Sequence, residues 1–169
     1  SPCFATVRAQ TAVASRRVGY RQGMTPEGQP TVLEFFAGAG LARLGLSDWH
    51  TIFANDLDPV KAAAYRANFG GETLSVEDVW NLVPDDLPTE SADLAWASSP
   101  CQDLSLAGGR KGLSARRSGA FWGFWRLIEA LDAQGRAPRL IVIENVIGLL
   151  SSDGGDDFRT LAEVLAGQG

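Results

Sequence analysis

The stretch TVLEFFAGAG, residues 31–40, decides the fold expected for this chain of 169 residues. Its first six residues form an apolar run rich in residues that favour β-strands, and its last four form a glycine turn. The pattern becomes helical from Leu41 to Leu46. A buried strand that passes through a glycine turn into a helix is the usual beginning of an α/β domain.

Strands and helices continue to alternate after this unit. We expect further strands at 51–54, 73–76, 93–97 and 140–143, and helices at 59–69, 118–131 and 156–165. This alternation predicts a doubly wound, mostly parallel sheet with right-handed crossovers. The aromatic residues of helix 118–131 are expected in the core rather than on a base-stacking surface. Residues 1–30 show no such period and are expected to be a disordered or extended tail.

Composition excludes several classes of protein. A hydrophobic fraction of 45% and a charged fraction of 21% argue against disordered, collagen-like and disulfide-scaffold chains. No apolar run approaches the roughly 20 residues that a membrane helix needs, so we expect a cytoplasmic protein with no membrane partner. Two cysteines, Cys3 and Cys101, are too few for a disulfide framework or a CxxC metal site, and no metal is expected. The single histidine, His50, receives no role.

Small and acidic residues gather at the predicted strand ends, where doubly wound sheets bind ligands. The glycine turn at residues 36–40 lets a ligand approach the backbone closely. Asp56 follows about 20 positions later, where its carboxylate could accept hydrogen bonds from ribose hydroxyls. Arg43 stands where a Gly-x-Gly-x-x-Gly motif needs its last glycine, which disfavours a pyrophosphate dinucleotide. The alternative is a structural turn with a helix-capping aspartate, and Asp78 suits either an adenine amino group or a turn.

Reactive side chains follow the next two predicted strands. Cys101 stands after Pro100 and could attack an electron-poor carbon as a thiolate, if its pKa is lowered and its mount is rigid. Glu144 on the neighbouring strand could donate a proton to a heterocycle nitrogen. A small buried cysteine and a glutamate that caps the next helix explain the same residue types equally well.

Residues 102–117 are expected to form a long mobile loop, because they lack apolar periodicity and contain Gly108, Gly109 and Gly112. The formal net charge of −5 argues against general binding of polyanions, but this loop concentrates positive charge. It could contact phosphates, and a solvated charged loop is the alternative. Its basic residues are Arg110, Lys111, Arg116 and Arg117.

In order and spacing, these motifs resemble those of the DNA cytosine-5 methyltransferases over roughly residues 31–165. The resemblance rests on the glycine turn, Asn55-Asp56-Leu57-Asp58, Asp78, residues 99–105, Arg117-Ser118-Gly119 and Glu144-Asn145-Val146. The Pro-Cys-Gln and Glu-Asn-Val blocks together are highly diagnostic. The resemblance implies a Rossmann-like sheet of the S-adenosylmethionine-dependent methyltransferase type, with S-adenosylmethionine as cofactor and carbon 5 of cytosine in double-stranded DNA as target.

The resemblance also implies roles for individual residues. Cys101 would add to carbon 6 of a cytosine flipped out of the duplex, while Glu144 protonates or hydrogen-bonds ring nitrogen 3. Asp56 would hold the cofactor ribose, Leu57 would pack on the adenine, and Asp78 with Val79 would meet the adenine edge. The rest of the cofactor site would be Phe36, Ala37, Gly38, Gly40 and Pro100. The loop would contact DNA through Gln102, Ser105, Arg110, Lys111, Arg116 and Arg117.

Departures from the family pattern bear on function. Leu41 stands where many relatives carry a glycine. The chain lacks the Gln-x-Arg-x-Arg block, the target-recognition region and the late Gly-Asn block. We therefore expect residues 31–169 to be a partial catalytic domain, a fragment or one half of a split enzyme, whose sheet is truncated at its C-terminal end with an unpaired apolar edge. A second chain or a missing C-terminal region would supply target recognition.

Three other functions remain open at this point. A relative that methylates cytosine in transfer RNA would share the Pro-Cys block. A nucleotide-binding oxidoreductase of similar topology would need neither Cys101 nor Glu144. A non-catalytic binding module would keep the fold without turnover.

Overall fold

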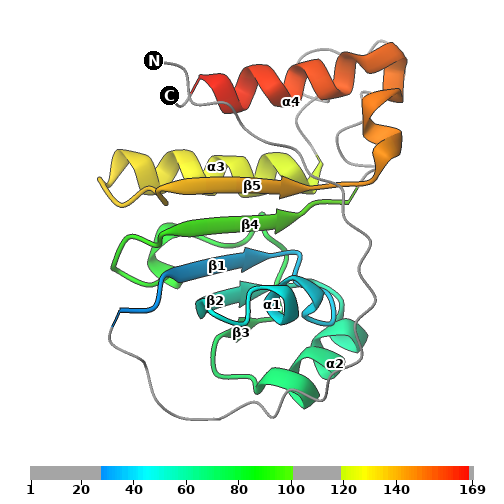
Figure 1. Ribbon diagram of the computed structural model, residues 1–169. Coiled ribbons are helices and arrows are strands. Elements are labelled where there is room, and N and C mark those ends of the chain that lie inside the picture. The colour runs from blue at the N-terminus through cyan, green and yellow to red at the C-terminus, as the bar shows by residue number, and fades with distance from the viewer. Residues whose placement is uncertain (1–27, 101–118, 168–169) are drawn as a thin grey trace.

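The computed structural model describes residues 28–100 and 119–167, and its strands form one parallel sheet (Figure 1). The strand order is β3-β2-β1-β4-β5. The strands are β1 (Thr31–Phe35), β2 (His50–Asn55), β3 (Leu74–Ser75), β4 (Leu94–Ser98) and β5 (Leu140–Glu144). The order reverses at β1, which pairs with β2 on one side and with β4 on the other. The predicted parallel α/β sheet is therefore confirmed.

Helices connect these strands at the expected places. The α-helices are α1 (Leu41–Gly45), α2 (Pro59–Phe69), α3 (Ala120–Ala133) and α4 (Asp156–Ala166). Short 3-10 turns add η1 (Pro84–Asp86), η4 (Ile147–Leu150) and η5 (Ser152–Gly155). In Figure 1, α2 lies next to the β2–β3 side of the sheet and α3 next to the β4–β5 side.

Several element boundaries differ from prediction. β2 is longer than 51–54 by one residue at each end, and β3 keeps only the two central residues of 73–76. β3 is short because it pairs with β2 through two residue pairs only, Ala54 with Leu74 and Asn55 with Ser75. The 3-10 turns after β5 were not predicted, since no apolar period announces them. Most of the predicted tail, residues 1–27, lies outside the described residues.

Side chains that alternate along β1 contact helices on both faces of the sheet. Leu33 and Phe35 point into the main hydrophobic core, where Phe35 packs edge-on against Phe124 of α3 with ring centroids 5.0 Å apart. Glu34, between them, points to the opposite face and accepts a hydrogen bond from Tyr65 of α2. The fold is therefore doubly wound, with α3 on one face and α2 on the other.

The aromatic residues of α3 lie mostly in the core, as predicted. Phe121, Phe124 and Trp125 are buried, and Trp122 is half-buried against the same core. Leu161 of α4 is buried in this core as well. These contacts anchor α3 and α4 over the β4–β5 half of the sheet.

The start of α2 follows directly from its sequence. Asp58 caps the helix by accepting hydrogen bonds from the backbone N–H groups of Val60 and Lys61, at 2.8 and 3.4 Å. Pro59 occupies the first turn, where its missing N–H group costs nothing. Gly70 ends the helix with a φ of 80°. Because Asp58 starts α2 immediately after β2, residues 55–58 are held at the carboxyl edge of the sheet.

Candidate active site

The glycine turn leaves β1 with unusual backbone conformations. Phe36, Gly38 and Gly40 have positive φ angles of 55°, 58° and 87°. Such a conformation costs a bulky residue on the order of 1–3 kcal/mol, and strain of this kind gathers at functional sites. Within residues 28–100 and 119–167, the space beside Gly38 is open, because a Cβ built there would meet none of their atoms within 4 Å. A ligand therefore has room to approach the backbone of the turn.

Asp56 ties the glycine turn to the end of β2. One carboxylate oxygen accepts a 2.7 Å hydrogen bond from the backbone N–H of Gly38, and the other accepts one of 2.8 Å from Asp58. The side chain is only 6% exposed. Each carboxylate oxygen has a second lone pair, so Asp56 can still accept hydrogen bonds from a ligand. Its neighbour Leu57 is 62% exposed and offers an apolar surface at the same edge.

Asp78 and Val79 occupy the segment that follows β3. The Asp78 carboxylate is half-buried and accepts a 2.9 Å hydrogen bond from the backbone N–H of Trp80. Val79 is buried in the main core. The side chain of Val79 is therefore not available to an adenine edge, a restriction that the sequence did not indicate.

The ends of β4 and β5 lie side by side at the same edge. Ser98 pairs with Glu144 in the parallel register of the two strands. Asn145 then donates a 2.9 Å hydrogen bond from its side-chain amide to the backbone carbonyl of Ser99. Glu144 is exposed, as is Pro100. The sheet thus brings the Glu-Asn-Val block against the residues that lead into Cys101.

Other predicted site residues fall outside the described part of the chain. They are Cys101 and the predicted DNA-contacting residues Gln102, Ser105, Arg110, Lys111, Arg116 and Arg117. His50, to which no role was assigned, begins β2 at the opposite edge of the sheet.

Glu34 is a residue near the site that the sequence analysis did not single out. It is 1% exposed and accepts hydrogen bonds from the Tyr65 hydroxyl at 3.1 Å and from the backbone N–H of Arg43 at 3.3 Å. Burial raises the pKa of its carboxyl, and the hydrogen bond from Tyr65 acts in the opposite direction. The available signal was a single charged residue inside the apolar run 31–36.

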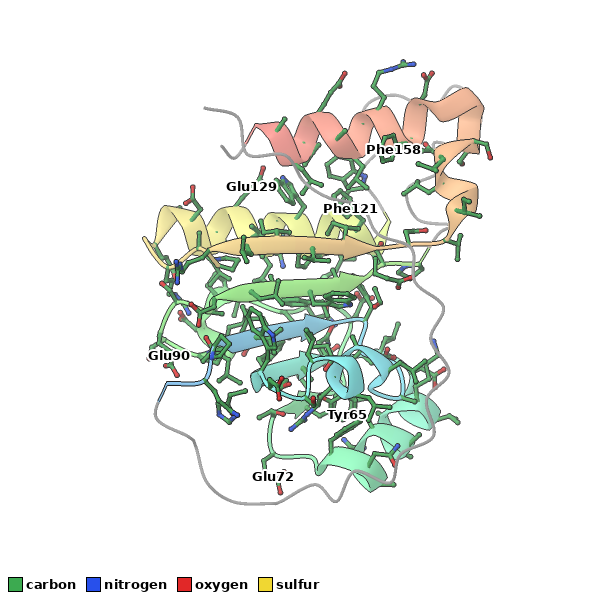
Figure 2. All side chains as sticks on the ribbon, in the orientation of Figure 1. Tyr65, Glu72, Glu90, Phe121, Glu129 and Phe158 are labelled. Carbon is green, nitrogen blue, oxygen red and sulfur yellow. The ribbon has the colours of Figure 1, made fainter. Side chains whose placement is uncertain are left out.

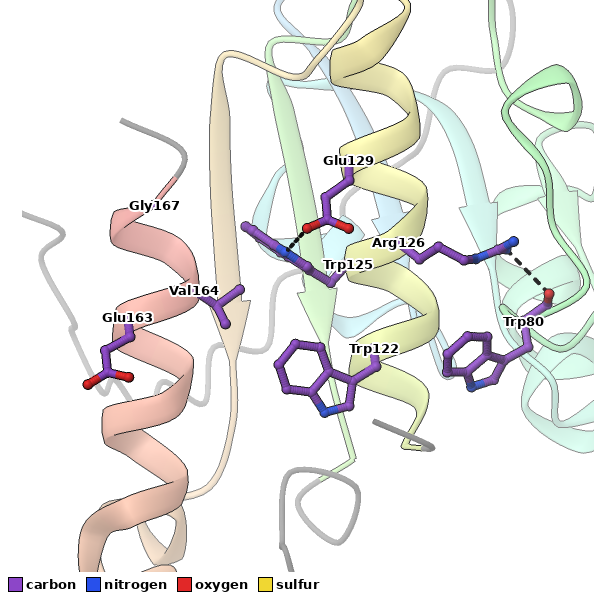
Figure 3. A pocket seen from close by; sticks show the side chains of 8 residues that line it. All are labelled: Trp80, Trp122, Trp125, Arg126, Glu129, Glu163, Val164 and Gly167. Atoms are coloured by element: carbon purple, nitrogen blue, oxygen red, sulfur yellow. Dashed lines mark hydrogen bonds between the residues drawn. The ribbon is translucent and has the colours of Figure 1, made fainter. Parts of the chain in front are cut away.

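A separate cavity of about 420 Å³ lies between α3, α4 and Trp80 (Figure 3). Its walls include Trp122, Trp125 and Glu129, and the Trp125 indole donates a 3.1 Å hydrogen bond to Glu129. None of its lining residues belongs to the predicted site. The candidate site is therefore the open edge of the sheet rather than this cavity.

Two absences hold within residues 28–100 and 119–167. No helix there is long and apolar enough to cross a membrane. No group of three or more His, Cys, Asp or Glu residues in these ranges is arranged to hold a metal ion.

Comparison with known proteins identifies the family. The family model of the C-5 cytosine-specific DNA methylases matches residues 30–169. The chain belongs to this family. Members of the C-5 cytosine methylase family use S-adenosylmethionine as methyl donor.

Individual methylases match the chain over part of their own length. Type II methyltransferase M2.BsuMI of Bacillus subtilis (strain 168) is 39% identical over 138 residues, which cover 80% of this chain and 34% of the relative. M.Bsp6I of Bacillus sp. (strain RFL6) is 33% identical over 142 residues, covering 82% of this chain and 42% of the relative. The crystal structure of S. pombe Dnmt2 methyltransferase superposes with a TM-score of 0.59 at 26% identity, over 79% of this chain and 41% of that chain. The chain thus spans between a third and somewhat over two-fifths of these proteins.

The residues at the carboxyl edge of the sheet fit S-adenosylmethionine. Gly38 leaves open space beside the turn, Asp56 offers carboxylate oxygens suited to ribose hydroxyls, and Leu57 exposes an apolar surface suited to a purine ring. These residues come from the ends of β1 and β2, next to the point where the strand order reverses.

Proposed function

We propose that this chain forms the cofactor-binding and nucleophile-bearing part of a DNA cytosine-5 methyltransferase. The observation that carries the proposal is the hydrogen bond from Asn145 to Ser99, which joins the Glu-Asn-Val block to the residues preceding Cys101. Membership of the C-5 cytosine methylase family supports the chemistry. The naming of relatives as type II methyltransferases supports DNA as substrate.

In this proposal the carboxyl edge of the sheet holds S-adenosylmethionine. Asp56 accepts hydrogen bonds from the ribose, Leu57 packs on the adenine, and the Asp78 side chain with the Val79 backbone meets the adenine edge. When bound, the cofactor supplies an electrophilic methyl group. The remaining cofactor contacts come from Phe36, Ala37, Gly38, Gly40 and Pro100.

Cys101 and Glu144 carry the proposed chemistry on the base. The target cytosine leaves the duplex at a cost of a few kcal/mol. The Cys101 thiolate forms a bond to carbon 6, and Glu144 gives a proton to ring nitrogen 3, so that carbon 5 becomes nucleophilic. After carbon 5 is methylated, solvent water takes the carbon 5 proton, the bond between sulfur and carbon 6 breaks, and nitrogen 3 returns its proton to Glu144. The thiolate and the aromatic ring are thereby restored.

Recognition of DNA requires further groups. We propose that the loop residues Gln102 and Ser105, with the basic side chains after them, contact the flipped base and phosphates. Further sequence or a second chain would supply target recognition and cover the outer edge of β5, where Leu140 is exposed. The protein would act in the cytoplasm.

Trapping with 5-fluorocytosine tests this function. Release of the thiolate requires a base to remove the proton from carbon 5. Fluorine replaces that proton and cannot be removed by a base, so the bond from sulfur to carbon 6 persists. The natural protein that carries this chain, with any partner chain, is incubated with S-adenosylmethionine and duplex DNA containing 5-fluorocytosine. We expect a denaturation-resistant adduct that peptide mass spectrometry places on Cys101.

Two matched variants control the experiment. Cys3→Ser removes the other thiol of the chain and should leave the adduct intact, while Cys101→Ser should abolish it. No adduct in the wild type, or an adduct that survives Cys101→Ser, overturns the mechanism. An adduct with transfer RNA but not with DNA overturns the proposed substrate.

A further inference from the structure

A network of three side chains, in which Glu34 and Tyr65 are buried and Arg43 is half-buried, lies directly behind the glycine turn. Glu34 comes from β1, Arg43 from α1 and Tyr65 from α2. The Tyr65 hydroxyl donates to Glu34 at 3.1 Å and accepts from the Arg43 guanidinium at 2.9 Å. The backbone N–H of Arg43 donates to the other Glu34 oxygen at 3.3 Å. The network therefore links the strand before the turn, the helix after it and the helix that packs against both.

Burial makes this network sensitive to the loss of any one bond. Glu34 is 1% exposed and Tyr65 is 0% exposed. The Arg43 guanidinium lies over the rings of Tyr65 and Phe69, 5.5 and 5.0 Å from their centroids. A buried carboxyl group is costly unless donors satisfy it. Removing the Tyr65 hydroxyl would leave one Glu34 oxygen without its donor.

Tyr65 also touches the turn itself. It shares a small core cluster with Ala37 and Ala54. A Cβ on Gly40 would lie 2.3 Å from the Phe69 ring and 3.1 Å from the Tyr65 ring, so the turn rests directly on these two rings. Figure 2 shows Tyr65 in the region between α1 and α2. Movement of the Tyr65 ring would therefore change the backbone of residues 37–40.

We propose that Tyr65, held by Glu34 and Arg43, is a positioning residue that sets the shape of the cofactor-binding turn. Tyr65 contacts no ligand in this scheme and acts through the backbone of Ala37 and Gly40. The inference rests on the proposed function, because it takes the turn to bind S-adenosylmethionine. Its consequence is that cofactor affinity depends on a hydroxyl group behind the site.

The test uses Tyr65→Phe in the natural protein that carries this chain. We expect the dissociation constant for S-adenosylmethionine, measured by calorimetry, to rise about tenfold, because the turn would then hold its binding-competent shape in only about a tenth of the unliganded molecules. Turnover at saturating cofactor should be unchanged. In the wild type, the amides of Gly38 and Gly40 donate hydrogen bonds to Asp56 and Ala37. Without cofactor, hydrogen exchange at these two amides should be faster in Tyr65→Phe than in the wild type.

A core substitution on the opposite face of the sheet separates positioning from general stability. Ile128→Val trims a buried side chain of α3 and should lower stability without changing cofactor affinity or exchange at the turn. If Tyr65→Phe does not fold, Arg43→Lys replaces it, since lysine keeps the charge but lacks the planar fork that reaches the hydroxyl.

The results distinguish failure of the Tyr65 role from failure of the proposed function. If the wild type does not bind S-adenosylmethionine, the proposed function fails and the inference fails with it. If the wild type binds and Tyr65→Phe binds equally well, only the inference is overturned. Equal weakening by Tyr65→Phe and Ile128→Val also overturns it, because the effect would then be general loss of stability.

Discussion

The side-chain amide of Asn145 donates a 2.9 Å hydrogen bond to the backbone carbonyl of Ser99. The two residues are 46 positions apart in sequence, and each lies just beyond the end of its strand. Parallel pairing of β4 with β5, in which Ser98 faces Glu144, brings them together. Asn145 thus fixes the backbone from which the proposed nucleophile follows.

Asn145→Asp tests this link with a side chain of the same shape. A carboxylate cannot donate to the Ser99 carbonyl, so the segment before Cys101 loses its anchor. We expect the rate of adduct formation with 5-fluorocytosine DNA to fall on the order of 10- to 100-fold, as small misplacements of reacting groups do.

Asn68→Asp is the control for the Asn145 experiment. Asn68 is exposed on α2, and the same loss of an amide there should leave adduct formation unaffected. An Asn145→Asp protein that forms the adduct at the wild-type rate would contradict the anchoring role.

Alanine substitutions should separate the two glycines of the turn. Both have positive φ, which costs an alanine about 1 kcal/mol, but only Gly40 lacks space for a methyl group. Gly40→Ala should lower the free energy of unfolding by roughly 2–4 kcal/mol, because the methyl group meets the Phe69 ring. Gly38→Ala should lower it by about 1 kcal/mol and chiefly weaken cofactor binding. Denaturant unfolding and calorimetry measure the two effects, and equal stability losses would contradict this division.

Asp56→Asn should disturb the turn and its ligand together. An amide offers one oxygen, so the N–H group of either Gly38 or Asp58 loses its acceptor. We expect a loss of about 1–3 kcal/mol in unfolding free energy and weaker cofactor binding. Asp58→Asn makes the same change in charge two residues away and should be nearly neutral, because asparagine caps helices as well as aspartate does. Equal unfolding free energies and equal cofactor affinities of the two variants, measured by denaturant unfolding and calorimetry, would contradict the role given to Asp56.

Glu34 should give stability a distinctive pH dependence. Burial, the largest cause, raises the pKa of its carboxyl in the folded state above the ordinary value of 4.5. The folded chain therefore binds this proton more tightly than the unfolded chain does. The Glu34 contribution is fully present below pH 4.5 and is lost as pH rises through the raised pKa.

Glu34→Gln isolates this contribution. The free energy of unfolding of the wild type, minus that of the variant, should decrease as pH rises from 4.5 through the raised pKa of Glu34. Asp93 contributes with the opposite sign in both proteins, because the hydrogen bond from the Thr31 backbone lowers its pKa, and it cancels in the difference. A difference that stays constant with pH would contradict a raised pKa of Glu34.

Local sequence pattern was sufficient to predict most of the elements. The apolar run at 31–36, the helix after Pro59 and the apolar run at 140–143 each have a hydrophobic period or a cap that acts over a few residues. Their boundaries agree with the structure to within one or two residues. β3 was predicted too long, since its extent depends on pairing with β2 rather than on its own residues.

The sequence by itself determined that Asp56, Asp78, Pro100 and Glu144 lie at or just after strand ends, because strand formation and turn chemistry are local. Only the tertiary structure decided which strand ends are neighbours. The order β3-β2-β1-β4-β5 places Asn145 on Ser99 and joins Glu34, Arg43 and Tyr65 behind the turn. Contacts between residues so far apart depend on strand register and on which helix covers which face. Both are set by packing of the whole sheet, which no single stretch of sequence encodes.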